Sequence, residues 1–459
     1  MADAANHGPV VAIVGAGPAG LRAAEALALA GLRPVLFDEA PRPGGQIYRR
    51  PPPGAERPGR DLYGLEAGKA AALHALLPAL GERIDHRAST LVWNVHENRL
   101  DTLCDGAFGE LAFDRLILAT GAMDRVIPFP GWTLPGVFTL GGAQIALKAQ
   151  GVSIGRRVAL VGAGPLLPLV AWQYAKAGAQ IAAVLDATPF SAKLRNAAGL
   201  AAEPLTLAKG LYYTVRTALR GARRASGVRA IRAEGAGRVE ALSWVGADGR
   251  EHRVACDAVG ASFGLRSETQ LADLAGCRFA FDEQTRQWTP QRKPDGRSSR
   301  PGVYLAGDGS GVGGADVAEL QGRRTALAVL EDMGRPVHAA EVARLDQALA
   351  RQARFRAALE AAYPYPDHLI AALPDDEILC RCEGVTAGAL RDAVRGKSAT
   401  EVNRVKAFTR IGMGRCQGRV CGHAAAELVA RELGRPPAEA GRLRGQPPVK
   451  PIPVLGAPR

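Results

Sequence analysis

VVAIVGAGPAGLRAAEALALAGLRPVLFD, residues 10–38, contains an apolar run, a glycine turn, an Ala/Leu-rich stretch and a second apolar run that ends in an acid. This order predicts a buried strand, a helix and a second strand, which form one βαβ unit. Gly15 permits the tight turn, Gly17 lets the backbone approach a pyrophosphate, and Gly20 lets the helix pack closely on the strand. Free N–H groups at the helix start face the phosphates, and Asp38 is placed to accept adenosine ribose hydroxyls. The stretch predicts a dinucleotide site without distinguishing FAD from NAD.

The same pattern returns at residues 157–186, RVALVGAGPLLPLVAWQYAKAGAQIAAVLD. Gly162 and Gly164 keep the first two glycine positions, but Leu167 stands where the third is expected and Pro168 follows it. A leucine there pushes the helix away from the strand, so we expect a weakened grip on a nicotinamide dinucleotide. Three interpretations stay open: this second fold binds NAD(P), holds another nucleotide, or binds none and shapes an interface.

Two later segments resemble the flavoprotein disulfide reductase superfamily, which has two dinucleotide-binding domains. They are ILATGA at residues 117–122 and GVYLAGDGSG at residues 302–311. The resemblance implies FAD in the first fold, with Asp308 at the end of a strand beside the ribityl chain. The alternative for Asp308 is a turn aspartate that precedes a glycine.

The loop EAPRPGGQIYRR, residues 39–50, resembles the flavin-side loop of that superfamily, where glycines let the backbone pass close to the cofactor. Neither C-x-x-C nor C-x4-C occurs in residues 1–379, so the redox-active dithiol of a disulfide reductase is not expected. The candidate FAD contacts are Gly15, Ala16, Gly17, Pro18, Ala19, Gly20, Asp38, Glu39, Gly45, Gln46, Thr120, Gly121, Gly307 and Asp308, and the second fold adds Gly162 and Gly164 as candidate nucleotide contacts.

Four of the seven cysteines, Cys380, Cys382, Cys416 and Cys421, are spaced C-x-C-x33-C-x4-C. Two close pairs can supply four thiolates to a metal centre, whereas a reducing compartment disfavours disulfides. Formal charge does not separate a 2Fe-2S cluster from a structural zinc ion, although C-x-C is unusual for zinc fingers. The pattern resembles the bacterioferritin-associated ferredoxin (BFD) domain, a small helical module. That resemblance implies a 2Fe-2S cluster held by these four cysteines.

Composition and charge exclude several other functions. The 459 residues carry a net charge of +13, but the cations are scattered and only 5% of residues are aromatic, so nucleic-acid binding is not expected. No signal peptide opens the chain and no apolar run is long enough to span a bilayer. We expect a cytoplasmic protein, for which any contact with the inner membrane would be peripheral. The eight histidines form no recognisable acid/base constellation, so no catalytic residue is assigned.

Nearly the whole chain resembles the A (alpha) subunit of the opine oxidase, hydroxyproline dehydrogenase and hydrogen cyanide synthase family. DRVIPFPGWTLPGVFT (residues 124–139), the GAGPLL turn and TRIGMGRCQGRVCG (residues 409–422) carry that resemblance. It implies an α/β fold with two Rossmann-like dinucleotide domains and a helical 2Fe-2S domain. The expected divisions are 1–122 and 262–345 for a discontinuous FAD domain, 123–261 for the degenerate nucleotide domain, 346–379 for a helical linker, 380–435 for the BFD-like domain and 436–459 for a proline-rich extended tail.

The resemblance also implies partners and a reaction. An amino-acid-oxidase-like subunit with its own FAD oxidises a C–N bond, a small ferredoxin-like subunit completes the complex, and electrons reach a quinone or respiratory acceptor. FMN at a subunit interface occurs in related enzymes and is a further candidate cofactor. Two other hypotheses stay open: a self-sufficient NAD(P)H-dependent FAD/2Fe-2S reductase, and a redox carrier without enzymatic activity. The tail is either a disordered end or an arm that docks on the partner.

Overall fold

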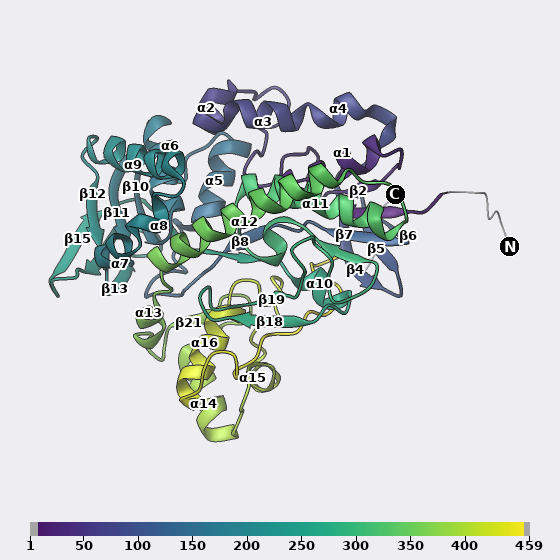
Figure 1. Ribbon diagram of the computed structural model, residues 1–459. Coiled ribbons are helices and arrows are strands. Elements are labelled where there is room, and N and C mark those ends of the chain that lie inside the picture. The colour runs from purple at the N-terminus through teal and green to yellow at the C-terminus, as the bar shows by residue number, and fades with distance from the viewer. Residues whose placement is uncertain (1–7, 454–459) are drawn as a thin grey trace.

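The computed structural model describes residues 8–453 and has two parallel sheets and a helical C-terminal module (Figure 1). This is the fold class that the sequence predicts. The expectations for residues 1–7 and 454–459 lie outside the described part of the chain. Within residues 8–453, no helix has both the length and the hydrophobicity needed to cross a membrane.

The first sheet is built around the apolar run of the opening βαβ unit. Its members and the elements beside it are β1 (Val11–Val14), β2 (Val35–Phe37), β3 (Asp85–Arg87), β7 (Arg115–Leu118), β20 (Val303–Leu305), α1 (Pro18–Leu29), α11 (Ala315–Asp332), α10 (Gln270–Leu274), β4 (Thr90–His96), β5 (Arg99–Cys104) and β6 (Ala107–Ala112). The five parallel strands lie in the order β20-β7-β1-β2-β3. Side chains alternate across a strand, so Val11 and Ile13 pack against α1 and α11, while Ala12 and Val14 face the antiparallel β4-β5-β6 sheet and α10.

The segment between β2 and β3 forms short helices that run along the top of the molecule in Figure 1. They are α2 (Gly59–Tyr63), α3 (Ala67–His74) and α4 (Leu76–Leu80), with 3-10 turns at Gly64–Glu66 and Gly81–Arg83. The His74 ring nitrogen Nε2 lies 2.8 Å from the backbone oxygen of Tyr48. This hydrogen bond ties α3 to the loop at residues 39–50.

The second sheet repeats the arrangement with the strand order β12-β11-β10-β16-β9, all parallel. Its elements are β9 (Val137–Thr139), β10 (Arg157–Ala163), β11 (Gln180–Asp186), β12 (Arg223–Ser226), β16 (Ala258–Phe263), α5 (Leu140–Ala149), α6 (Leu166–Lys176), α7 (Phe190–Arg195), α8 (Ala197–Leu200), α9 (Pro204–Ala218) and the antiparallel β13 (Ala230–Glu234), β14 (Ala241–Val245) and β15 (Glu251–Ala255). Leu167 is buried against Leu147 and Val184, so α6 stays packed on the sheet despite the missing glycine.

Two crossing strands join the nucleotide folds. β8 (Ala122–Asp124) pairs antiparallel with β17 (Leu265–Ser267), and the hairpin of β18 (Phe279–Asp282) and β19 (Gln287–Pro290) follows. The chain therefore leaves the first sheet near residue 122 and returns to it after residue 263. The exact domain boundaries expected from the sequence stay predictions.

The C-terminal part begins with a long helix across both folds. Its elements are α12 (Ala339–Ala362), α13 (Asp367–Ala371), β21 (Ile378–Cys380), β22 (Val385–Thr386), α14 (Ala387–Lys397), α15 (Val402–Thr409) and α16 (Gly422–Leu433). The core of this module is continuous with that of the second fold, and the Trp132 indole N–H donates to the backbone oxygen of Ile378 at 2.7 Å. The described end of the tail, residues 446–453, forms neither helix nor strand, bends at residues 447–450 and reaches the first fold.

Candidate dinucleotide site and cysteine cluster

The turn between β1 and α1 has the close contacts that its glycines predict. Gly15 has a φ of +108°, and a Cβ placed on Gly20 would lie 1.8 Å from the backbone oxygen of Gly15. By contrast, a Cβ on Gly17 would meet nothing closer than the Cα of Gly45 at 3.7 Å. No side chain caps the start of α1. The turn therefore leaves room and free N–H groups for a phosphate group above Gly17.

Asp38 holds this turn in place. Its carboxylate accepts the N–H of Ala16 at 2.5 Å and the N–H of Ala40 at 2.7 Å. Burial raises the pKa of Asp38, and the two backbone hydrogen bonds oppose that rise. Asp38 thus fixes the position of the turn relative to the end of β2, beside the place where a ribose would lie.

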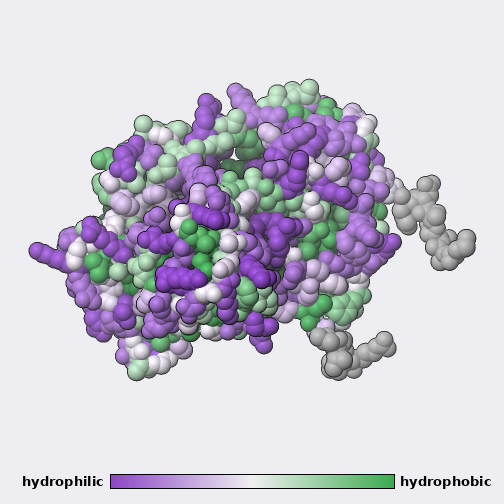
Figure 2. All heavy atoms as spheres, turned by 90° about the horizontal axis from the view of Figure 1, so that it is seen from below, coloured by the Kyte–Doolittle hydropathy of each residue, from purple (hydrophilic) through white to green (hydrophobic). Residues whose placement is uncertain are grey.

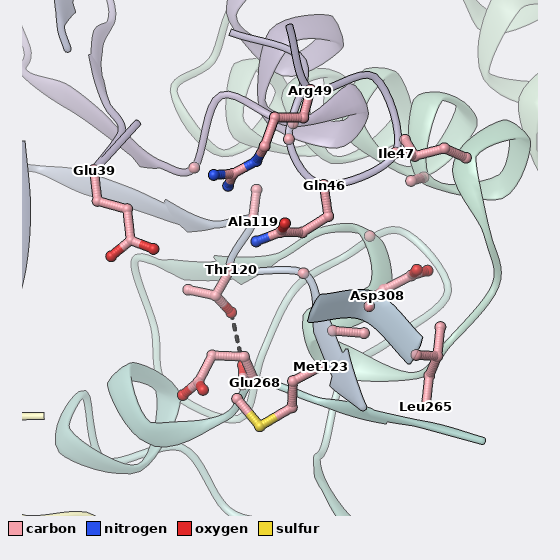
Figure 3. Close-up of a pocket in the computed structure, with 18 of the residues that line it drawn as sticks. Glu39, Gln46, Ile47, Arg49, Ala119, Thr120, Met123, Leu265, Glu268 and Asp308 are labelled. Atoms are coloured by element: carbon pink, nitrogen blue, oxygen red, sulfur yellow. Dashed lines mark hydrogen bonds between the residues drawn. The ribbon is translucent and has the colours of Figure 1, made fainter. Parts of the chain in front are cut away.

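A cavity of about 550 Å³ extends from this turn toward the second fold (Figure 3). Twelve candidate residues line it: Gly15, Gly17, Pro18, Ala19, Asp38, Glu39, Gly45, Gln46, Thr120, Gly121, Gly307 and Asp308. Ala16 and Gly20 belong to the turn itself and lie behind the lining, whereas Gly162 and Gly164 lie on the second turn, away from this cavity. Segments from residues 15 to 308 thus meet around one space.

Asp308 lies at the other side of the cavity, in the 3-10 turn Gly307–Ser310 that precedes α11. Its Oδ1 accepts the N–H groups of Gly313 and Gly314 at 2.8 and 2.9 Å. The N–H of Gly307 donates to the side-chain oxygen of Gln321 at 2.9 Å. These contacts hold the segment so that the start of α11 faces the cavity.

The structure adds cavity residues that the sequence analysis missed. Lys148 on α5 is 4% exposed, and its ammonium donates to the backbone oxygen of Ile47 at 3.1 Å. Burial lowers the pKa of Lys148 to about 8. Arg49 also lines the cavity, and its buried Nε has no hydrogen-bond partner within the described part of the chain. Lys148 stands in an ordinary amphipathic helix, so no sequence signal marks it.

The second nucleotide fold differs from the first in the contacts of its acid and in the size of the adjacent cavity. The Asp186 carboxylate at the end of β11 contacts the ammonium of Lys193 at 2.5 Å and accepts the N–H of Thr188 at 2.8 Å. The nearby cavity measures only about 130 Å³ and is bordered by Leu167, Pro168 and Tyr363. The acid that would meet a ribose is therefore already paired, and the space beside it is small.

The four predicted cysteines converge in the C-terminal module. Cys421 lies beside Cys380 and Cys416, and Cys416 lies beside Cys382. The neighbouring Cys421 lowers the pKa of Cys380 to about 6 and that of Cys416 to about 5. Cys421 stands at the N-cap position of α16, so its sulfur lies at the positive end of the helix dipole.

The spacing of the sulfurs bears on the kind of centre they can hold. A tetrahedral zinc ion with Zn–S bonds of about 2.3 Å puts every pair of sulfurs about 3.8 Å apart. Across residues 8–453, no three cysteine sulfurs all lie within 4.8 Å of one another. The four sulfurs are therefore more widely spaced here than the ligands of a bound zinc ion.

The cysteine loop touches the first fold at a short junction. The Arg419 guanidinium contacts the Glu268 carboxylate at 2.7 Å, and the Gln270 side-chain amide donates to the backbone oxygen of Gln417 at 2.7 Å. The backbone oxygen of Glu268 in turn accepts the hydroxyl of Thr120 at 2.7 Å (Figure 3). Both Glu268 and Arg419 line the first cavity. The cavity and the cysteines therefore share one wall.

The donor sets fit the two groups that the sequence suggests. Gly17 leaves space for a pyrophosphate, Arg49 lines the cavity, and the first turn of α1 is uncapped. Four cysteine sulfurs near a helix start and beside the half-buried Arg266 suit an anionic iron-sulfur cluster. Burial lowers the pKa of Arg266, and the neighbouring Glu268 and cysteines oppose this shift.

Comparisons with known proteins agree with this arrangement. Residues 9–322 match the family described as pyridine nucleotide-disulphide oxidoreductase, and residues 378–431 match the BFD-like [2Fe-2S] binding domain. The chain is 38% identical to the A subunit of opine oxidase from Rhizobium meliloti, over 96% of this chain and 86% of that protein. It is 34% identical to hydrogen cyanide synthase subunit HcnB of Pseudomonas aeruginosa, over 96% of both chains.

A solved structure extends the likeness to the whole fold. L-proline dehydrogenase from P. horikoshii superposes with a TM-score of 0.72 at 21% identity, covering 97% of this chain and 78% of that one. The two family matches, in the predicted order, make this chain an FAD- and 2Fe-2S-type oxidoreductase subunit. The chain belongs to the pyridine nucleotide-disulphide oxidoreductase family, in the group that contains the A subunit of opine oxidase and the HcnB subunit of hydrogen cyanide synthase.

Proposed function

We propose that this chain is the electron-transfer subunit of a multi-subunit, dye- or quinone-linked dehydrogenase. A partner subunit oxidises the C–N bond of an amino acid or opine, and this chain relays the electrons toward a quinone or respiratory acceptor. The observation that carries the proposal is the shared wall at Glu268 and Arg419, where a dinucleotide cavity meets a four-cysteine centre.

FAD accepts two electrons as a hydride equivalent, and a 2Fe-2S cluster passes them one at a time. The residues of this chain bind and orient these groups. Gly17 and the start of α1 receive the pyrophosphate, and Lys148 and Arg49 supply positive charge inside the cavity. Cys380, Cys382, Cys416 and Cys421 hold the cluster. A pair of this kind can divide a two-electron oxidation into one-electron steps.

Substrate chemistry is assigned to a partner because no histidine of residues 8–453 is placed for acid/base work at the first cavity. His74 contacts a backbone oxygen of Tyr48 and His368 contacts a backbone oxygen of Val228. No histidine among residues 8–453 lines the first cavity. Two relatives that match 96% of this chain, at 38% and 34% identity, are named as subunits, which supports an assembly.

Helix α9 offers a surface for that partner, because its apolar side faces outward. Its inner side carries Lys209, which pairs with Glu66, and the fully buried Thr217. The exposed side of α9 presents large apolar side chains: Leu205, Leu207, Leu211, Tyr212, Val215 and Leu219. Exposed apolar side chains gathered along one helix mark an interface. The face seen in Figure 2 instead has mainly hydrophilic residues with small hydrophobic groups.

The charge beside this surface indicates the chemistry of its partner. Residues 187–229 contain eight Lys and Arg residues and one acid, Glu203. We assign the exposed apolar side of α9 to the amino-acid-oxidase-like subunit, which would present an apolar patch rimmed by carboxylates. The small ferredoxin-like subunit would then bind elsewhere.

A second cavity is the candidate place for FMN. It measures about 430 Å³ and lies on the other side of the loop at residues 310–313. Arg292 and Arg356 line it and can bind a phosphate, and burial lowers the pKa of Arg292. Gln287 borders both this cavity and a smaller one that reaches Gln417 beside the cysteines. An FMN here would lie on the route toward the cluster.

A self-sufficient NAD(P)H-dependent reductase is the alternative, and the second fold argues against it. Asp186 is paired with Lys193, and the adjacent cavity of about 130 Å³ is too small for a nicotinamide dinucleotide. A carrier that works through its cysteine module alone is also disfavoured, because that module shares one core with the second fold. We infer that the second fold shapes an interface and binds no NAD(P).

The test is to purify the chain alone and together with an amino-acid-oxidase-like partner, and to measure dye reduction with amino acids and opines. We expect activity only in the complex, and no flavin bleaching when NADH or NADPH is mixed with the chain. Leu211→Glu should abolish co-purification, whereas Leu29→Glu, with the same 62% exposure on α1, should not. Rapid bleaching by NADH, or turnover by the chain alone, would replace this proposal with the reductase.

A further inference from the structure

The tail of the chain returns to the dinucleotide cavity after passing the cysteine module. The N–H of Val449 donates to the backbone oxygen of Trp93 at 3.1 Å, next to β4. The Val449 side chain is 2% exposed and packs with Val92 and Leu271 of the first fold. We call residues 446–453 the C-terminal strap. Val449 is its buried anchor.

The next residue of the strap reaches the end of β2. The Lys450 ammonium pairs with the Glu39 carboxylate, and both side chains line the first cavity. They are 37% and 49% exposed, so the ion pair alone contributes little stability. The ion pair matters because of where it lies in the site. Glu39 follows Asp38, and the acid at the end of this strand marks the adenosine side of a Rossmann site.

Arg419 connects the strap to the cysteine loop. Its guanidinium contacts Glu268 at 2.7 Å, and its Nη1 donates to the backbone oxygen of Val449 at 2.5 Å and to that of Cys416 at 3.5 Å. Arg419, Val449 and Lys450 all line the cavity. The first fold builds most of this cavity. One wall, however, comes from Arg419 and the strap, which lie more than a hundred residues after α10 in the sequence.

We propose that Arg419 and the C-terminal strap complete the dinucleotide site by closing its adenosine end, so that FAD binding and docking of the cysteine module stabilise each other. This inference rests on the proposed FAD site. Four cations line the cavity, Arg49, Lys148, Arg419 and Lys450, and half of them come from the C-terminal part. They face a ligand whose pyrophosphate is anionic.

Coupling of this kind is reciprocal. If the strap tightens FAD binding by some factor, bound FAD must favour the docked strap by the same factor. Couplings between sites are typically about 5- to 150-fold. If the strap merely covers the surface, its removal would not change FAD affinity, and FAD would not change how firmly the strap is docked.

The experiment uses the full holoprotein and two truncations. One ends after Gly445 and removes the strap, and its matched control ends after Pro453 and leaves the strap intact. We measure the rate of FAD release by the rise in flavin fluorescence, with circular dichroism to check folding and acid-labile sulfide to check the cluster. The truncation after Gly445 should release FAD at least 5-fold faster than the full chain, and the control should match the full chain.

A point variant keeps the test decisive if the shorter chain fails to fold. Lys450→Glu puts two carboxylates together at the adenosine end and should also raise the rate of release, whereas Lys450→Arg should restore it. Conversely, FAD should slow carboxypeptidase digestion of the strap by a similar factor. Equal release rates in all of these proteins would overturn the coupling. Absence of flavin from the intact chain would instead overturn the FAD site itself.

Discussion

The Nε atom of Arg419 lies 2.7 Å from a carboxylate oxygen of Glu268, and their side chains are only 12% and 15% exposed. This ion pair joins the loop that carries Cys416 and Cys421 to the strand that leaves the second fold. Because little water reaches either group, the partner left behind by a substitution would keep a poorly solvated charge.

We therefore expect Arg419→Met to destabilise the protein by about 2–4 kcal/mol, somewhat below the cost of breaking a fully buried pair. Urea unfolding at neutral pH measures this change. Arg395→Met is the matched control, because Arg395 pairs with Glu432 but is 67% exposed, and its loss should cost about 0–1 kcal/mol. Equal effects of the two substitutions would mean that the junction contributes no more than an ordinary surface pair.

Two glycines of the first turn should respond differently to the same methyl group. In Gly20→Ala the new Cβ meets the backbone oxygen of Gly15 at 1.8 Å, so the turn cannot form without a shift of α1. In Gly17→Ala the nearest atom is 3.7 Å away, so the fold accepts the methyl group. The same methyl group occupies space that a pyrophosphate needs.

We expect Gly17→Ala to keep the wild-type melting temperature of the FAD-free protein and to contain little flavin. Gly20→Ala should melt at a lower temperature or stay insoluble. Thermal unfolding and flavin content after acid precipitation give the two readouts. A Gly17→Ala protein with a full complement of FAD would show that the ligand does not approach this turn.

The cysteine quartet predicts a labile cluster whose loss leaves the flavin in place. Cys382→Ser should remove acid-labile sulfide and the visible absorption of the cluster, while FAD stays bound through the first fold. Cys104 lies on β5, outside the quartet, so Cys104→Ser serves as the control and should keep both groups. Zinc without sulfide in the wild-type protein would contradict a 2Fe-2S centre.

Local patterns predicted most of the fold because each depends on residues close in sequence. The turn at Gly15 and the second turn at Gly162 both follow from short local segments of strand, glycine turn and helix. The convergence of the four cysteines also follows from spacing combined with a family pattern. In each case a few residues close in sequence determine the local structure.

Contacts between distant segments could not be predicted in this way. Lys450 and Glu39 are 411 positions apart, and Arg419 and Glu268 are 151 apart. Neither the strap nor the ion pair has a local signature, and the tail was expected to be disordered or to dock on a partner. The structure instead packs its described part on the first fold of the same chain. Helix α9 follows an amphipathic pattern, but only the tertiary structure shows that its apolar side faces outward.

Lys148 should make the stability of the FAD-free protein depend on pH in a characteristic direction. Burial lowers its pKa from 10.5 to about 8 in the folded state, so the folded protein releases this proton before the unfolded chain does. Below pH 8 both states carry the charge, and the folded state bears the desolvation penalty. Between about pH 8 and 10.5 the unfolded chain binds more protons, so stability from this group rises with pH.

Full deprotonation of Lys148 in the folded state would raise the free energy of unfolding by on the order of 3 kcal/mol. Lys148→Met should be more stable than the wild type at pH 7, and the difference should shrink as the pH rises through 8 toward 10. Urea unfolding of both FAD-free proteins at pH 7, 8.5 and 9.5 measures this, since other titrating groups cancel in the comparison. A difference that stays constant over this range would mean that Lys148 is solvated and carries its charge throughout. Bound FAD, with its anionic pyrophosphate in the same cavity, should raise the pKa of Lys148 and move the rise in stability to higher pH.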